Sequence, residues 1–282
     1  MVNESPGTRS RRRLRPTRRG RLVLLVTAFL VLVAAAAVLV PLLTRESKTE
    51  QARTLVIPEG WRASQVYAAA DKALGEPAGT TEKAVAAADL PLPSEAKGNP
   101  EGYLFPATYP VTSATTPKSL LRYMVDTAVK RFGADHITAG AQRNRVTVYQ
   151  TVTVASIVQA EADTESDMGK VARVVHNRLE RGMPLQMDST LNYAMNRSTL
   201  DTTEGDTKID SPYNSYERKG LPPTPIGNPG EQAMVAAISP TPGPWLYFVT
   251  VAPGDTRFTD DYAEQQRNVA EFNRNRREAG SG

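Results

Sequence analysis

An uncharged apolar run near the start of this 282-residue chain limits what the whole chain can be. It extends from Leu22 to Leu43 and reads LVLLVTAFLVLVAAAAVLVPLL. A transmembrane helix needs about 20 such residues, whereas the apolar region of a secretory signal has roughly 7–15. The run therefore predicts one membrane-spanning helix at 22–43. The alternative is a signal peptide that is cleaved at alanines 35–37.

The charges on the two sides of this run are unequal. Eight arginines against Glu4 give residues 1–21 a charge of +7, and because the whole chain carries +4, the remainder carries −3. Positive residues gather on the cytoplasmic side of a membrane span. We therefore expect a cell-membrane protein with a cytoplasmic basic tail at 1–21 and an extracytoplasmic remainder. The acidic remainder argues against a nucleic-acid-binding domain.

Residue types that usually carry metal or nucleophilic chemistry are scarce. The chain has no cysteine, and its two histidines are His136 and His176. Disulfides, thiolate nucleophiles and cysteine-bound zinc are thereby excluded, and a Ser-His-Asp triad is disfavoured. We expect no metal and no cofactor, so any chemistry should depend on carboxylates.

The rest of the chain divides into a stalk and two folded parts. Residues 44–52 are polar, and residues 53–112 predict a small strand–helix–helix–strand module. Residues 113–282 predict a mostly helical domain, so the fold class is α+β. The expected elements are strands at 54–57, 103–105 and 108–111, helices at 64–74, 81–89, 117–133, 139–162, 167–181 and 231–238, a loop at 211–230, a hairpin at 246–258, and a last helix that ends near 274.

Glu161 is the strongest candidate for a catalytic residue. Val154, Ile157 and Val158 precede it by seven, four and three positions, so all four share one helix face. A carboxyl on an apolar face loses water, which raises its pKa, as a general acid near neutral pH requires. The alternative is a helix-end glutamate that turns to solvent, since three further acids follow within six positions.

Two further clusters are candidates for the same site. Asp188 could be a second carboxylate of the kind that glycosidases use, or the N-cap of a helix that starts at Ser189. The loop at 211–230 carries Tyr213 and Tyr216, and long loops in compact domains are often functional. With Trp245, these tyrosines could stack on sugar rings, or they could anchor the loop as buried aromatics.

Eight short motifs follow one another over residues 55–260. They are IPEG at 57–60, EGYLFP at 101–106, ASIVQAE at 155–161, NRL at 177–179, LQMD at 185–188, SPYNSY at 211–216, GLPP at 220–223, and LYF at 246–248 behind Pro240. In this order, behind a single N-terminal anchor, they resemble the endolytic murein transglycosylases of the YceG/MltG-like family.

The resemblance implies a LysM-like module at 53–112 and a transglycosylase domain at 113–282. It implies cleavage of the MurNAc–GlcNAc bond of nascent peptidoglycan strands, which leaves 1,6-anhydro-MurNAc ends and terminates glycan elongation. Glu161 would act as acid and then as base, without an enzyme nucleophile, metal or cofactor. The substrate-binding residues that we infer are Gln186, Asp188, Tyr213, Asn214 and Tyr216. Glycan strands and the membrane are the expected partners, and peptidoglycan synthases are further candidates.

Two other functions stay open from the sequence. One is a catalytically silent wall-binding or assembly factor that recruits synthases. The other is a hydrolytic muramidase in which Glu161 and Asp188 act on a water molecule. The chemical form of the product ends, anhydro or reducing, would distinguish the transglycosylase from the muramidase.

Overall fold

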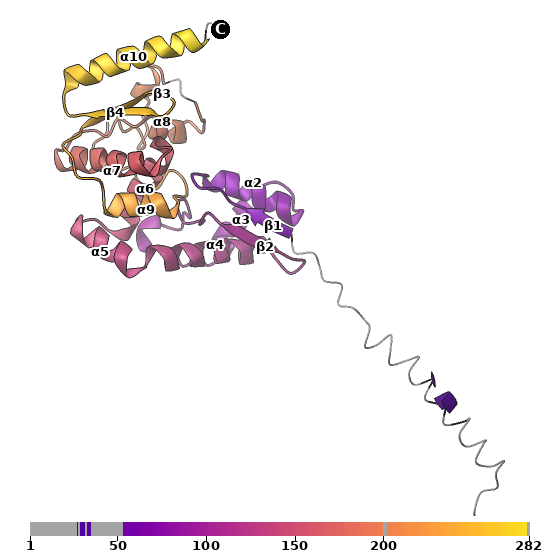
Figure 1. Ribbon diagram of the computed structural model, residues 1–282. Coiled ribbons are helices and arrows are strands. Elements are labelled where there is room, and N and C mark those ends of the chain that lie inside the picture. The colour runs from indigo at the N-terminus through magenta and orange to yellow at the C-terminus, as the bar shows by residue number, and fades with distance from the viewer. Residues whose placement is uncertain (1–26, 28, 32, 35–52, 200–201, 281–282) are drawn as a thin grey trace, which may run out of the picture. The chain divides into compact units, whose positions relative to one another are not determined.

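The computed structural model describes residues 27, 29–31, 33–34, 53–199 and 202–280. The predicted tail and stalk, and all but six positions of the predicted span, lie outside the described residues, so these three assignments stay predictions. Among the described residues, no helix is long and apolar enough to cross a membrane. Residues 53–280 belong to one unit of mixed α and β structure that is mostly helical (Figure 1), as expected.

The unit begins with the predicted order of strand, helix, helix and strand. β1 (Arg53–Val56) pairs antiparallel with β2 (Thr108–Val111), with Arg53 opposite Val111. Between them come α2 (Ala63–Leu74), α3 (Thr80–Ala84) and two 3-10 turns, η1 (Val85–Ala87) and η2 (Ser94–Ala96).

A buried carboxylate joins the two helices of this part. Asp71 of α2 is 3% exposed, and it accepts hydrogen bonds from the N–H of Gly79 and from both the N–H and the hydroxyl of Thr81. These bonds satisfy donors at the start of α3 that the helix itself leaves free.

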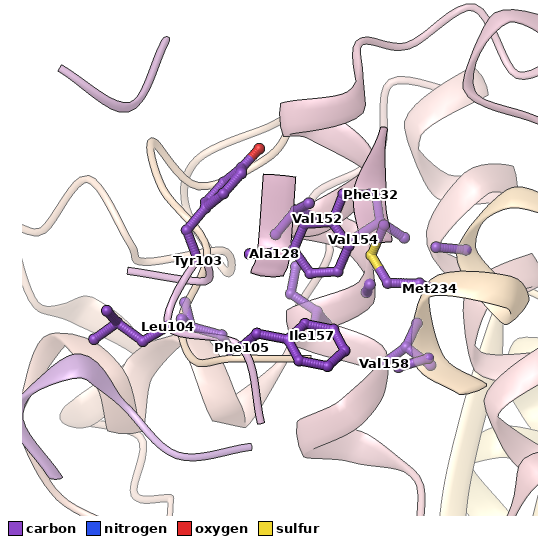
Figure 2. Close-up of a cluster of buried hydrophobic side chains, with 14 of the residues drawn as sticks. Tyr103, Leu104, Phe105, Ala128, Phe132, Val152, Val154, Ile157, Val158 and Met234 are labelled. Carbon is purple, nitrogen blue, oxygen red and sulfur yellow. The ribbon is translucent and has the colours of Figure 1, made fainter. Parts of the chain in front are cut away.

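The strand predicted at 103–105 is wrong. Tyr103, Leu104 and Phe105 are buried in turns and irregular chain rather than paired in a sheet. Pro106 follows them, and proline has no N–H to give to a ladder. The apolar run therefore indicates burial in the core, which Figure 2 shows, and not strand structure.

The remaining elements form the helical part. They are α4 (Pro117–Phe132), α5 (Asp135–Arg143), α6 (Val148–Glu161), α7 (Glu165–Glu180), α8 (Asp188–Ala194), η3 (Asp206–Lys208), α9 (Glu231–Ile238), the antiparallel hairpin of β3 (Tyr247–Ala252) and β4 (Asp255–Thr259), and α10 (Tyr262–Gly280). α6 packs against α7 and α9, while α10 packs on the hairpin.

The single helix predicted at 139–162 is two helices. α5 ends at Arg143, and Arg145 has a left-handed backbone with φ +56°. A capping box then starts α6: the N–H of Gln150 donates to the Thr147 hydroxyl, and the N–H of Thr147 donates to the Gln150 side chain. Thr147 and Gln150 have the spacing that is typical of a helix start. Local capping, behind the polar residues 142–145, therefore divides the predicted helix.

α6 is the centre of the core. Figure 2 shows Val152, Val154, Ile157 and Val158 of this helix among side chains from α4, α9 and the 103–105 segment. The turn before that segment requires a glycine at 102, where φ is +83°. A Cβ there would lie 2.5 Å from Pro225, so the EGYLFP motif can approach the loop before α9 only without a side chain.

Candidate active site

Glu161 is the last residue of α6 and lies where this buried helix reaches the surface. Val154, Ile157 and Val158 are fully buried, as predicted. The prediction of a single apolar face is wrong, because residues 151–158 are buried on every side of the helix. Glu161 is thus placed at the boundary of the core by the end of the helix and not by an amphipathic stripe.

The carboxyl of Glu161 contacts the start of α8. Its Oε1 accepts a hydrogen bond of 3.2 Å from the backbone N–H of Ser189. Burial raises the pKa of Glu161, Ser189 favours the carboxylate and partly lowers it, and the nearby charge of Asp188 raises it. The net result is a pKa above the ordinary value, and this is the direction of shift that a general acid working near neutral pH requires.

Asp188 is the first residue of α8, and Met187 occupies the N-cap position, so the alternative role of Asp188 as an N-cap is wrong. The Tyr216 hydroxyl donates a hydrogen bond of 2.5 Å to Asp188 Oδ1. Burial, together with this bond, raises the pKa of Tyr216, so its hydroxyl keeps its proton at neutral pH. The structure therefore brings Glu161, Asp188 and Tyr216 together around the first turn of α8.

Arg178 of α7 fixes the segment that leads into α8. The residue is 5% exposed, and its Nη1 donates to the carbonyls of Pro184 at 3.0 Å and Leu185 at 2.8 Å and to Gln186 Oε1 at 2.9 Å. Its Nε donates to the carbonyl of Leu246 at 2.6 Å. Within the described residues no carboxylate pairs with this guanidinium. Its charge is solvated by neutral oxygens of the segments that it holds together.

Gln186 is exposed, and its backbone is left-handed with φ +53°. Such a conformation costs a non-glycine residue about 1 kcal/mol or more and persists only where the surroundings enforce it. Here the N–H of Gln186 donates to the Ser215 carbonyl, and the N–H of Met187 donates to the Ser215 hydroxyl, both at 2.9 Å. The 184–188 segment is therefore held by α7 on one side and by the 211–216 loop on the other.

The aromatic and amide residues of the loop have different surroundings. Tyr213 is partly exposed, its ring lies 4.9 Å from that of Tyr193, and its hydroxyl bonds to Thr224. Asn214 is 1% exposed, and its amide nitrogen donates to the carbonyls of residues 207 and 209. Asn214 shapes the loop, and its binding of substrate stays a prediction. The ring of Trp245 packs against that of Phe258, with 5.9 Å between the ring centroids.

One buried carboxyl was not among the site residues predicted from the sequence. Glu101 of the EGYLFP motif is 4% exposed, and it accepts hydrogen bonds of 3.0 Å from the Ala63 N–H and the Tyr193 hydroxyl. Burial raises its pKa to about 7, against the effect of these two bonds and of the nearby Arg62. The only available signal was an acid that precedes a buried apolar run.

Within the described residues no three His, Cys, Asp or Glu side chains lie where they could share a metal ion. His176 is buried in α7, and its Nε2 bonds to the carbonyl of Ala237 at 2.9 Å. Burial lowers the pKa of His176, so it is a neutral packing residue at pH 7.

The order of motifs and the fold around them match a known family. A model of the YceG-like family matches residues 33–271. The chain belongs to the YceG-like family. A solved YceG-like protein from Listeria monocytogenes has the same fold as this one, with a TM-score of 0.67 and 28% identity, over 79% of this chain and 77% of that chain.

Two curated relatives carry an activity in their names. This YceG-like protein is 36% identical over 169 residues to the endolytic murein transglycosylase of Bacillus subtilis. It is 37% identical over 177 residues to the endolytic murein transglycosylase of Streptococcus pneumoniae. The matches cover 59% and 61% of this chain and 46% and 32% of those relatives. The chain therefore spans less than half the length of the curated relatives that it matches.

Proposed function

We propose that this YceG-like protein is a peptidoglycan lytic transglycosylase that cleaves the MurNAc–GlcNAc bond inside nascent glycan strands. The observation that carries the proposal is the half-buried carboxyl of Glu161, which has a raised pKa and accepts a hydrogen bond from the Ser189 N–H at the start of α8. The endolytic murein transglycosylases that it resembles at 36–37% identity support the choice of substrate.

One carboxyl is sufficient for this reaction. Protonated Glu161 gives its proton to the bridging oxygen, so the bond between C1 of MurNAc and that oxygen breaks and GlcNAc leaves with a hydroxyl. The C6 hydroxyl of the same MurNAc then bonds to C1, and the Glu161 carboxylate takes the hydroxyl proton. Glu161 returns to its acid form, and the new end is 1,6-anhydro-MurNAc. A pKa near the working pH suits both half-steps.

The other groups of the site would orient the sugar. Tyr216 keeps its proton and bonds to Asp188, so Asp188 serves as a fixed acceptor beside Glu161. Gln186 is exposed at the edge of the site, and Tyr213 presents part of its ring to solvent. We infer that Asp188, Gln186 and the two tyrosines bind glycan, while Asn214 holds the loop that carries the tyrosines.

Product analysis tests the proposal directly. The full-length protein in detergent is incubated with uncrosslinked glycan strands, and the products are identified by mass spectrometry. Internal cleavage with anhydro ends is the expected result. Reducing MurNAc ends would instead make the protein a hydrolytic muramidase, and intact strands would leave it a wall-binding or assembly factor.

The substitution Asp188→Asn is a second test that distinguishes the transglycosylase mechanism from the muramidase mechanism. The amide still accepts the Tyr216 hydrogen bond but cannot act as a base, so anhydro-end formation should fall by less than about tenfold if Asp188 only orients substrate. A second catalytic carboxylate would lose about 10²–10⁴-fold, as general acid–base groups do. The initial rate of end formation at pH 7 is the measurement.

We also propose that residues 22–43 anchor the protein as a single-pass membrane protein with its catalytic part outside the cytoplasm. The support is the apolar length and the eight arginines before it. Protease added to intact cells without a wall should degrade residues 53–280 and spare a cytoplasmic marker. Full protection of that part until the cells are lysed would contradict the topology.

We infer that the 53–112 part is LysM-like from its order of strands and helices.

A further inference from the structure

α8 connects the catalytic carboxyl to the strand–helix–helix–strand part of the chain. Its first turn contains Ser189, whose N–H bonds to Glu161, and Tyr193 follows four residues later. Residues four apart lie on one helix face, about 6 Å apart along the axis. A group that holds Tyr193 therefore also fixes the position of Ser189.

Glu101 is the group that holds Tyr193. One carboxyl oxygen accepts from the N–H of Ala63, the first residue of α2, and the other accepts from the hydroxyl of Tyr193, both at 3.0 Å. Residues 63, 101 and 193 are far apart in sequence, so Glu101 joins three separate segments. It is 4% exposed, and in such surroundings each broken hydrogen bond leaves a costly unpaired group.

A second contact ties the same two helices. The Arg62 guanidinium lies 5.3 Å over the ring of Tyr193, and its Nη2 donates to the carbonyl of Arg197, just after α8, at 2.8 Å. α2 and α8 are thus joined through the hydroxyl of Tyr193, through its ring and through the chain beyond it. Of Glu101, Arg62 and Tyr193, only Glu101 is buried, and the other two are half-buried.

We propose that Glu101 is a positioning residue for Glu161: its carboxyl fixes α8 against α2, and so holds Ser189 and Asp188 against the catalytic carboxyl. This inference rests on the proposed function, because it assigns Glu101 a role in the same reaction. It goes beyond that function because it makes the rate depend on a contact with the 53–112 part of the chain.

The charged and titratable groups that surround Glu101 keep the same protonation state around neutral pH. Arg62 faces it from the start of α2, Tyr67 from within α2, Tyr149 from α6 and Tyr193 from α8. Burial raises the pKa of each of the three tyrosines, so all three stay protonated. Burial lowers the pKa of Arg62, which still stays charged at pH 7. Glu101 is therefore the only one of these five groups that titrates near pH 7.

Two substitutions break the contact to different degrees. Tyr193→Phe removes the hydroxyl and keeps the ring that meets Tyr213 and Arg62, whereas Glu101→Ala removes both hydrogen bonds. Asp71→Asn is the matched control, because Asp71 is an equally buried carboxyl whose bonds stay inside the α2–α3 pair.

The first readout is the kinetics of anhydro-end formation by the full-length protein across pH 5–9. Tyr193→Phe and Glu101→Ala should lower kcat by roughly 10–100-fold, the cost of a small misplacement of reacting groups, with less change in KM. When the contact with Glu101 is lost, α8 can move away from Glu161 and water can reach its carboxyl. The pKa of Glu161 then falls, so the alkaline limb of the profile of kcat against pH should move to lower pH. Asp71→Asn should lower the Tm but leave kcat and its dependence on pH as in the wild type.

The second readout does not need activity. Exchange of the Ser189 backbone amide hydrogen, followed by NMR, should be faster in Tyr193→Phe and unchanged in Asp71→Asn. A Tyr193→Phe protein with wild-type exchange at Ser189 overturns the inference, whatever Glu101→Ala does to folding. If the wild type makes no anhydro ends, the proposed function fails, and the exchange result still decides whether Glu101 positions α8.

Discussion

Replacing Glu161 with glutamine is expected to lower the rate of anhydro-end formation by at least about 10²–10⁴-fold. Glutamine keeps the volume of the side chain and can still accept the hydrogen bond from the Ser189 N–H. It cannot donate the proton that the leaving oxygen needs, nor take one from the C6 hydroxyl. Both half-steps use the same group, so neither is spared.

The folded state should tolerate this change. Burial raises the pKa of Glu161, so the folded protein binds a proton that the unfolded chain releases. The resulting penalty is absent below the ordinary glutamate pKa of about 4.3 and grows as pH rises toward the folded pKa. Glu161→Gln removes the penalty, and its Tm at pH 7 should equal or exceed that of the wild type.

The rate of end formation and the Tm are measured on the same preparations. Glu165→Gln is the matched control, because Glu165 is an exposed acid four positions further along the chain. It should keep wild-type activity and Tm. Near-normal production of anhydro ends by folded Glu161→Gln protein would remove Glu161 from the mechanism.

Replacing Arg178 with methionine is expected to lower the free energy of unfolding more than any other substitution proposed for this protein. The change leaves the buried carbonyls of Leu185 and Leu246 without their donor. Each buried unpaired acceptor costs about 1–3 kcal/mol, partly offset because a buried cation is also removed. A net loss of about 3 kcal/mol corresponds to a fall in Tm of about 6–12 °C for a domain of this size.

Thermal unfolding of the full-length protein is the measurement. Arg178→Lys keeps the charge but offers no planar fork of donors, so its Tm should lie between those of wild type and Arg178→Met. Arg122→Met is the control, because Arg122 is exposed and its ion pairs with Asp89 and Asp126 are 3.9 and 3.7 Å long. Exposed pairs contribute about 0–1 kcal/mol. Equal Tm values for Arg178→Met and the wild type would contradict our account of the 184–188 segment.

The elements whose position depends on residues close together in the chain could be predicted from the sequence. The strand–helix–helix–strand order, the end of α4 before Gly133 and the β3–β4 hairpin follow from periodicity and turn residues within a few positions. The break between α5 and α6 also had a local signal that the prediction of one long helix did not use, the pair Thr147 and Gln150 behind the polar residues 142–145. Glu161 was predicted as a desolvated carboxyl on an apolar helix face; it is half-buried, and its place at the end of a wholly buried helix puts it there.

Contacts between distant segments could not be predicted in this way. The Glu101–Tyr193 bond joins residues 92 positions apart, and Arg178 reaches Leu246 across 68 positions. Nothing within a few residues of Glu101 indicates which donors will meet it. Asn214 illustrates the same limit, because its place in a polar, aromatic motif suggests a ligand contact, whereas the chain folds its side chain inward.

The burial of α6 on every side has a consequence for how the protein moves. A helix enclosed by α5, α7, α8 and α9 opens only when the whole unit unfolds, whereas a seven-residue helix and a surface loop can open locally at lower free energy. Glu161 is therefore attached to the part of the chain that fluctuates least. Under the proposed function, we expect the motions that admit and release a glycan strand to occur in the α8 and 211–230 segments, while Glu161 stays in place.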